Sequence, residues 1–352
     1  MRKIFLAGVL ALSSVAQAQS GAPPAAQPAA QPVPFVRAEA AAAVTDLAVK
    51  LESQFVFPDI GKQYATMLRH NLAIGRYDQF ADADGFAQTV TEDIQAVHKD
   101  GHLHLLVLRP DQAGKRAMKP PTARSGLVKS GWIADGVAYL AFGGFPGNEA
   151  SLADLRNFIA SHGRAKSMII DIRSHRGGGM DEINLLFPQL FAEETALLDM
   201  DARETVAAQR PAPGPEDFVR LIDGPTGVVR RQHYVVPAAD PAFRDTKVYL
   251  LVGKDTVSAA EHLAMALKRT HRAILIGEAT RGAGNFGMFE EIAHGFEAFI
   301  PFGRTFDPDT GEGWEGVGVQ PDIKVPADKA LDEALKRAGV QAAGEEALAT
   351  LK

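Results

Sequence analysis

A serine stands between a strand-like run and a helix-like run in KDTVSAAEHLAMALKR, residues 254–269. The preceding VYLLVG has the unbroken apolar character of a buried parallel strand, and the apolar residues after Ser258 recur at helical spacing. A side chain at such a turn lies at the carboxyl edge of the sheet, where ligands bind, and the N–H of Ala259 could donate to an oxyanion. Two interpretations of Ser258 follow. It is either a nucleophile or a helix N-cap, for which Glu261 completes the capping-box spacing.

A glycine triplet follows a second strand-like run. In IIDIRSHRGGGMDE, residues 169–182, a buried strand runs into Gly177, Gly178 and Gly179. Glycines let the backbone approach a ligand closely and direct N–H groups toward it. A flexible turn or a phosphate loop would also contain glycines, although the Walker lysine and the GxGxxG spacing are both missing. The triplet is therefore a candidate source of oxyanion donors.

Two histidines in KDGHLHL are candidates for a general base, because the pKa of histidine suits proton transfer near neutral pH. His102 and His104 are expected on one face of a strand spanning residues 102–108. Either could be the base, or the two together could bind a metal, or each could have only a packing role. A metal site would be incomplete, because no third acidic or histidine ligand lies nearby in the sequence. We therefore predict no metal and no cofactor.

An acidic residue, Glu315, lies in the glycine-rich stretch GEGWEGVGVQPDIKV, residues 311–325. A carboxylate that orients the base would complete a nucleophile, base and acid set. A loop acid without such a role is the alternative. The chain has no cysteine, so covalent catalysis must use another residue, and disulfides and thiolate metal sites are excluded.

Helical patterns come first in the chain, and alternating strands and helices follow. Residues 36–99 carry apolar residues at three-to-four spacing, and with the following strand they form a predicted N-terminal helical domain, residues 36–112. Residues 126–326 alternate apolar strands with helices, which is typical of a largely parallel sheet covered by helices, here an α/β catalytic core. Residues 203–243, rich in Pro and Gly, interrupt this rhythm. Residues 327–352 are predicted to form a C-terminal helix.

The first residues have the pattern of a signal peptide. In MRKIFLAGVLALSSVAQA, two basic residues precede an apolar run too short to span a bilayer, and AQA forms a small-x-small cleavage site. We therefore expect residues 1–18 to be removed and residues 19–35 to form a disordered Pro/Ala/Gln linker. The mature chain is then expected in the periplasm or outside the cell.

The composition argues against nucleic acid and membranes as partners. The 352 residues are 46% hydrophobic and 23% charged, with a formal net charge of −6. A mildly acidic chain without a basic tract is poorly suited to bind nucleic acid or anionic lipid. No segment after the signal is a long apolar run, so we expect a soluble protein without a membrane span. The oligomeric state is not predicted.

Five motifs follow one another in the order DGHL, IIDIRSHRGGG, VYLLVGKDTVSAAEHLA, AILIGEATRGAG and WEGVGVQPDIKV. Together they resemble the C-terminal-processing (tail-specific) serine peptidase family, in particular the branch with interphotoreceptor retinoid-binding protein and the tricorn core protease. The helical region, with FVFPDIGKQY and DGFAQTVTEDI, is similar to the N-terminal helical domain of the retinoid-binding-protein branch. The resemblance implies an α/β fold, with a ClpP/crotonase-like core and a small N-terminal helical domain.

The resemblance also implies roles for individual residues. The matching positions are Ser258 as nucleophile, His102 as general base, Glu315 as the residue that orients this base, and the backbone of Ala259, Gly177 and Gly178 as oxyanion donors.

Three positions depart from the family pattern. Ala283, in TRGAG, stands where the tail-specific branch has its catalytic lysine. Gly101 replaces the serine that precedes the histidine in the tricorn-like branch. His175 replaces the asparagine that is common in the glycine loop of the family.

These implications lead to an exported serine peptidase that hydrolyses peptide bonds of a polypeptide or peptide through an acyl-enzyme. The alternative is a non-catalytic carrier of apolar small molecules on the same fold, which the missing lysine and the retinoid-binding relatives suggest. A crotonase-type acyl-CoA enzyme is a third hypothesis, because an oxyanion hole also serves thioesters. Export away from cytoplasmic CoA argues against this third hypothesis.

Overall fold

The computed structural model describes residues 33–109 and 124–351. The predicted signal segment, residues 1–18, lies outside the described residues, and so does most of the predicted linker. Residues 110–123, where the predicted helical domain ends, lie outside them as well. No helix in the described ranges is long and apolar enough to cross a membrane.

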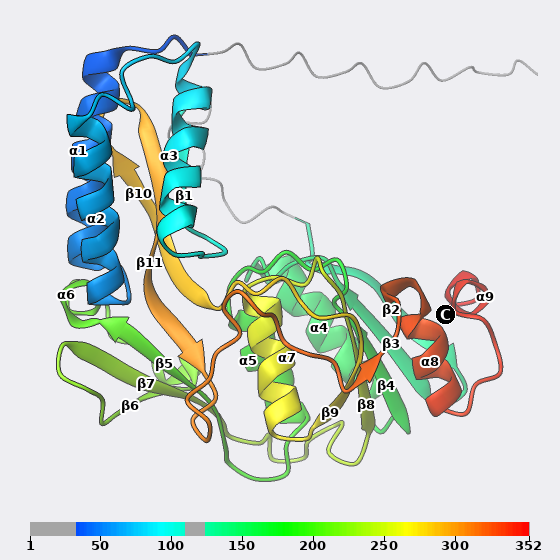
Figure 1. Cartoon of the computed structure of the whole chain (residues 1–352). Coiled ribbons are helices and arrows are strands. Elements are labelled where there is room, and N and C mark those ends of the chain that lie inside the picture. The colour runs from blue at the N-terminus through cyan, green and yellow to red at the C-terminus, as the bar shows by residue number, and fades with distance from the viewer. Residues whose placement is uncertain (1–32, 110–123, 352) are drawn as a thin grey trace, which may run out of the picture. The chain divides into compact units, whose positions relative to one another are not determined.

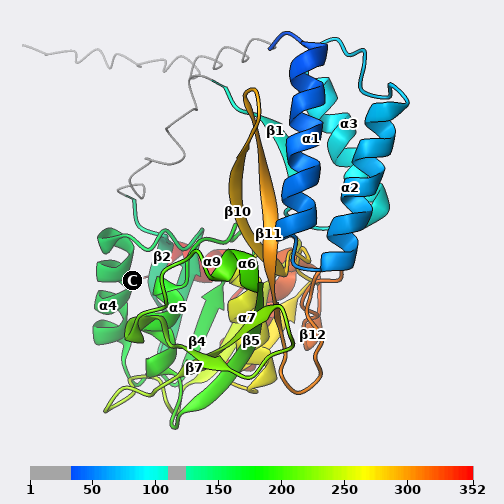
Figure 2. The same ribbon diagram turned by 90° about the vertical axis from the view of Figure 1, so that its left-hand side faces the viewer.

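Three helices form the N-terminal part of the described chain: α1 (Arg37–Gln54), α2 (Pro58–Ala73) and α3 (Ala83–Val97). Pro58 at the start of α2 fits a helix start, where its missing N–H costs nothing. The carboxylate of Asp82 caps α3 by accepting a hydrogen bond from Gly85 N–H at 2.8 Å. The three helices bury their apolar sides in one cluster with strands β1, β10 and β11 (Figures 1 and 2).

A mostly parallel sheet carries the nucleophile candidate. Its strand order is β12-β9-β8-β4-β3-β2, and only the β2–β3 pair is antiparallel. The strands are β2 (Leu127–Ala134), β3 (Val137–Phe142), β4 (Ser167–Asp171), β8 (Lys247–Val252), β9 (Ala273–Gly277) and β12 (Ile323–Lys324). We call it the parallel sheet.

Helices cover both faces of the parallel sheet, as Figure 1 shows. Met168 and Ile170 of β4 pack on the side of α4 (Glu149–His162), α5 (Asp181–Leu186) and α7 (Ala259–Arg269). Ile169 between them packs on the opposite side, with α8 (Ala330–Arg337) and α9 (Gly344–Ala349). Burial on both faces is the reason why the strands are continuously apolar in sequence.

A second, antiparallel sheet contains six strands, with the order β1-β11-β5-β7-β6 and β10 paired to β11. The strands are β1 (His104–Val107), β5 (Thr195–Arg203), β6 (Val219–Ile222), β7 (Val228–Val235), β10 (Asn285–Ile292) and β11 (Phe296–Phe306). The short helix α6 (Glu204–Ala207) and the one-turn 3₁₀ helices at Phe187–Gln189, Pro215–Asp217 and Ala327–Lys329 complete the elements.

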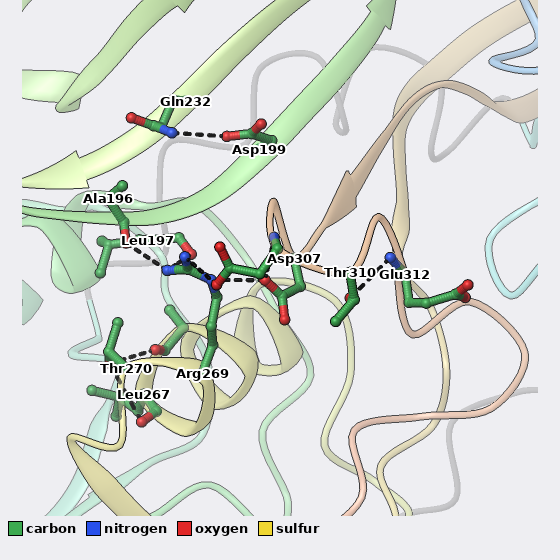
Figure 3. A network of polar contacts seen from close by, with 12 residues as sticks. Ala196, Leu197, Asp199, Gln232, Leu267, Arg269, Thr270, Asp307, Thr310 and Glu312 are labelled. Atoms are coloured by element: carbon green, nitrogen blue, oxygen red, sulfur yellow. Dashed lines mark hydrogen bonds and ion pairs between the residues drawn. The ribbon is translucent and has the colours of Figure 1, made fainter.

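Arg269 joins the end of helix α7 to the antiparallel sheet (Figure 3). Its guanidinium donates to the Asp307 carboxylate, to the Asp309 carboxylate and to the carbonyl of Ala196, each at 2.7 Å. Several charge-assisted hydrogen bonds on one guanidinium fix both partners firmly. The helix that follows Ser258 is therefore held at its far end.

The structure agrees with the predicted α/β class and differs in three places. Residues 203–243 do not merely interrupt the core, because they supply β6 and β7 of the antiparallel sheet. Strand β1 begins at His104, so His102 lies in the bend before it and the two histidines do not share a strand face. The C-terminal segment forms α8 and α9 instead of one helix, because Gly339 has a φ of +82°, which ends α8.

A pair of buried histidines links α7 to the antiparallel sheet. His233 Nδ1 of β7 lies 2.8 Å from His262 Nε2 of α7, and His233 Nε2 lies 3.2 Å from Asn184 Oδ1. Because Asn184 Oδ1 can only accept, His233 carries its proton on Nε2, and His262 donates from Nε2. Burial lowers the pKa of His233 to about 4 and holds the pKa of His262 well below its usual value. Both rings are therefore neutral near pH 7.

We expect this pair to make the fold sensitive to acid. Neutral His233 contributes stability that is present above its unfolded pKa of about 6.5 and is lost as the pH falls toward its folded pKa of about 4. Between about pH 7.5 and pH 5, His233 alone should lower the free energy of unfolding by about 2 kcal/mol. Urea unfolding at both pH values should show this loss shrinking in His233→Gln. The exposed His70 serves as the control, and an equal effect of His70→Gln would contradict the prediction.

Candidate active site

Ser258 lies at the turn between strand β8 and helix α7. It has a φ of 60° and a ψ of −120°, a conformation that residues other than glycine rarely adopt. The side chain of Ser258 makes no capping hydrogen bond to the helix. Instead, the N–H of Ser258 donates to Oε2 of Glu261, in the first turn of the helix, at 2.8 Å. Ser258 therefore occupies the N-cap position, while its partly exposed hydroxyl is not used as a cap.

The glycine loop packs directly against the Ser258 turn. A Cβ atom added to Gly177 would lie 3.0 Å from the Cβ of Ser258, and Gly177 has a φ of +88°. The N–H of Val257 donates to the carbonyl of His175 at 3.0 Å, which ties the two segments together. Position 177 favours glycine, because side chains rarely adopt its φ and an added Cβ would make a tight contact with the nucleophile candidate.

The predicted oxyanion donors differ in what they already bind. The N–H of buried Gly177 donates to Nδ1 of His175 at 3.0 Å. Gly178 is exposed, and within the described residues neither its N–H nor that of Ala259 donates a hydrogen bond. These two N–H groups are the ones available to an oxyanion next to Ser258.

The neutral imidazole of His175 holds the glycine loop by a hydrogen bond. Burial lowers its pKa to about 4, and its Nδ1 accepts from Gly177, so the ring proton is on Nε2. The ring lies against that of Phe145, with 4.0 Å between centroids. This residue, which departs from the family asparagine, provides the same kind of acceptor that an asparagine oxygen would provide.

A buried carboxylate, Glu261, organises the loop that follows β9. It accepts from Thr280 Oγ1 at 2.5 Å, from Gly282 N–H at 2.6 Å and from Ala283 N–H at 2.9 Å, in addition to Ser258 N–H. Burial raises the pKa of Glu261, and the four donors act in the opposite direction. The sequence suggested Glu261 only as a capping-box partner; its contacts with residues 280–283 depend on the tertiary fold.

Glu315 binds the same loop at its other end. Its Oε2 accepts from Gly284 N–H at 2.6 Å and Asn285 N–H at 2.8 Å, and its Oε1 accepts from Gly101 N–H at 2.6 Å. Burial and the nearby Asp100 carboxylate raise the pKa of Glu315 to about 7, although the three N–H donors lower it. Glu315 therefore connects the loop to the residue that directly precedes His102.

His102 lies in a bend fixed by Asp100, whose Oδ1 accepts from the N–H of His102 at 2.8 Å. The imidazole stacks on the ring of Phe299, with 5.0 Å between centroids. Burial lowers the pKa of His102, while the charge of Asp100 raises it. Its Nδ1 is buried and has no hydrogen-bond partner within the described ranges. The ring is therefore neutral near pH 7, as a base must be.

The three predicted catalytic residues are linked through the loop of residues 280–285. Glu261 joins this loop to Ser258, and Glu315 joins it to Gly101, whose added Cβ would lie 3.0 Å from the Cβ of Ala283. Among the described residues, Ser258, His102 and Glu315 form no hydrogen bond with one another. Their roles therefore stay predictions at this stage.

No group of three His, Asp or Glu side chains in residues 33–109 and 124–351 has the arrangement of a metal site. His104 does not pair with His102 through the rings, because its Nδ1 contacts the carbonyl of His102. The sequence had not indicated two contributors to the site, Asp100 and Asn285. Asn285 donates from Nδ2 to Asp100 Oδ2 at 2.8 Å, although 185 positions separate them in the chain.

Solved structures share this α/β fold. A putative peptidase from Parabacteroides merdae is similar with a TM-score of 0.58 and 15% identity, covering 88% of this chain and 96% of the other. The photosystem II D1 C-terminal processing protease has a TM-score of 0.53 and 14% identity, covering 88% and 99%. A lipoprotein from Streptococcus agalactiae has a TM-score of 0.52 and 10% identity, covering 87% and 98%. These likenesses establish the fold.

Sequence comparison establishes the family. The profile of peptidase family S41 matches residues 136–325, and a profile described as the N-terminal domain of Peptidase S41 in eukaryotic IRBP matches residues 25–130. The chain belongs to peptidase family S41, a family of serine peptidases, and the predicted fold class is confirmed. Carboxyl-terminal-processing peptidase 3, chloroplastic, from Arabidopsis thaliana is 27% identical over 215 residues, 59% of this chain. The match spans only 34% of that relative's length.

We expect Glu261→Ala to lower the free energy of unfolding by about 3–5 kcal/mol, because it leaves four buried donors without an acceptor. Glu261→Gln keeps the shape but presents an NH₂ group to N–H donors, so it should lose a smaller part of this stability. Urea unfolding measures both. The exposed Glu312 serves as the control, since its replacement by alanine should change the stability by less than about 0.5 kcal/mol. Equal effects of the two alanine variants would contradict the role of Glu261.

Proposed function

We propose that this S41 peptidase hydrolyses peptide bonds through an acyl-enzyme on Ser258. The observation that carries the proposal is the contact between the Ser258 turn and the glycine loop. It places the partly exposed Ser258 against Gly177, and the N–H groups of the adjoining Ala259 and Gly178 donate to no acceptor among the described residues. A nucleophile with free backbone donors close by is the arrangement that acyl transfer needs.

The proposed reaction begins with Ser258 Oγ attacking the peptide carbonyl while His102 takes the hydroxyl proton. The carbonyl oxygen becomes an oxyanion and accepts from the N–H groups of Ala259 and Gly178, while Gly177 keeps the loop close to Ser258. Collapse of the intermediate breaks the C–N bond, and His102 gives its proton to the leaving amine. Water activated by His102 then hydrolyses the ester and regenerates Ser258.

Glu315 has the orienting role in this proposal. Its contact with Gly101 N–H, in the peptide bond between Asp100 and Gly101, supports an action through the backbone that leads to His102. A charged Glu315 holds three N–H donors, whereas a protonated one would direct a hydroxyl at one of them. Because its pKa lies at about 7, its orienting effect should weaken as the pH falls below neutral.

The proposal also includes export of the chain. It is supported by the residues at the start of the sequence, MRKIFLAGVLALSSVAQA, which have the pattern of a cleavable signal. The peptidase would then act on polypeptides outside the cytoplasm.

A fluorophosphonate probe should attach to Ser258, and Ser258→Ala should lose both labelling and cleavage of an unfolded polypeptide such as β-casein. Peptide mapping by mass spectrometry identifies the labelled residue. Ser174, an exposed serine before the glycine loop, provides the control variant Ser174→Ala, which should keep both properties. An unlabelled Ser258 would contradict the proposal, and a co-purified apolar molecule seen by native mass spectrometry would then favour the carrier alternative.

Replacement of His102 by glutamine should lower kcat/KM by roughly 10²–10⁴-fold, because the base is lost. The wild-type rate should rise with pH in two steps, one below about 6.5 as His102 loses its proton, because burial lowers the pKa of His102, and one near pH 7 as Glu315, whose pKa is about 7, loses its proton. His70→Gln, at an exposed histidine of α2, is the control and should change the rate by less than about threefold, within the small effects expected at exposed sites. Similar losses in both variants would argue against His102 as the base.

A further inference from the structure

The outer edge of the parallel sheet is open at strand β2. This strand is last in the sheet order and pairs only with β3 among the described residues. Val128 is 67% exposed, and Lys129 and Ser130 after it are exposed as well, whereas Ile133 in the second half of the strand is buried. Val128 lies at an irregularity in the register of β2 with β3, and the outer backbone groups of the first half of β2 pair with no strand among the described residues, so they can pair with another extended chain.

A cavity of about 370 Å³ connects this edge to the glycine loop. Five of its ten lining residues are glycines, and the only charged side chain is that of Arg124. The lining residues are Arg124, Ser125, Gly126, Val128, Gly143, Gly144, Phe145, Pro146, Gly177 and Gly178. The wall is therefore made largely of backbone, which recognises a main chain better than a particular side chain.

Close packing does not require a glycine at position 144. An added Cβ there would meet only the carbonyl oxygen of Gly177, at 3.4 Å, an ordinary contact. Gly178, in contrast, must be glycine, because an added Cβ would lie 2.1 Å from the carbonyl of Phe145. The N–H of Gly144 donates to no acceptor among the described residues, as is also true of Gly178. Position 144 thus leaves both space and an unused donor in the cavity.

We propose that the first half of β2 and this cavity bind the substrate polypeptide in an extended conformation, as an added strand that leads to Ser258. The occupant is a polypeptide main chain because the wall offers backbone donors and acceptors and almost no charge. The cavity is lined by Gly177, which packs against Ser258, and by Gly178, whose N–H is the candidate oxyanion donor, so a strand bound there lies next to the reacting centre. This inference rests on the proposed function of Ser258.

The test compares variants in the cleavage of β-casein and in fluorophosphonate labelling of Ser258, which needs no extended substrate. Val128→Asp puts a charge on the proposed strand edge, and Gly144→Ala fills the cavity. Both should raise KM for β-casein and lower kcat/KM at least about tenfold, because the docking contacts are lost. The labelling rate should stay within about twofold of the wild type, because the probe does not use the strand edge.

The chain offers a matched control for each variant. Leu221 is 73% exposed on β6, an edge strand of the antiparallel sheet, so Leu221→Asp is the control for Val128→Asp. Gly163 ends α4, and its added Cβ would meet its nearest atom at 3.4 Å, so Gly163→Ala is the control for Gly144→Ala. Both controls should cleave β-casein like the wild type.

Two results would overturn the inference in different ways. If Ser258 is labelled but Val128→Asp and Gly144→Ala cleave β-casein as their controls do, the substrate does not bind at this edge. If Ser258 takes no label in the wild type, the proposed function fails, and the docking proposal fails with it.

Discussion

One buried carboxylate, that of Glu261, determines the arrangement of the rest of the site. A charge without water is costly unless every oxygen is satisfied, and four donors from two segments satisfy this one. Those donors belong to Ser258 and to residues 280–283. The hydrogen bonds that offset the cost of burial therefore also hold the turn at Ser258 and the loop after β9 together. The unusual backbone of Ser258 persists because this interaction holds its N–H.

Glu315 repeats the same principle one step further along the loop. The carboxylates of Glu261 and Glu315 thus hold residues 280–285 from opposite ends through hydrogen bonds, and neither uses a side-chain ion pair. The loop also packs closely against Gly101, where an added Cβ would lie 3.0 Å from the Cβ of the small Ala283.

Local chemistry could be predicted from the sequence, and long-range pairing could not. The strands of the parallel sheet and the turn at Ser258 follow from continuous apolar runs and a helix start, and these are local patterns. The antiparallel sheet pairs β1 with β11, almost two hundred residues later, and no local pattern reports such a partner. The prediction that His102 lies on a strand face was wrong for a related reason. Asp100 accepts hydrogen bonds from the N–H groups of His102 and Leu103, so the strand begins only at His104. The link between Asp100 and Asn285 is equally invisible before the chain is folded.

The backbone at Ser258 also constrains how this sequence can change. A non-glycine residue with a positive φ stores strain of about 1–3 kcal/mol, which glycine would release. Selection for a more stable fold alone would therefore replace this serine by glycine, and every lineage that keeps the hydroxyl carries that cost. Persistence of serine at position 258 among relatives of this chain would thus be a record of selection for what its side chain does, not for how the protein folds.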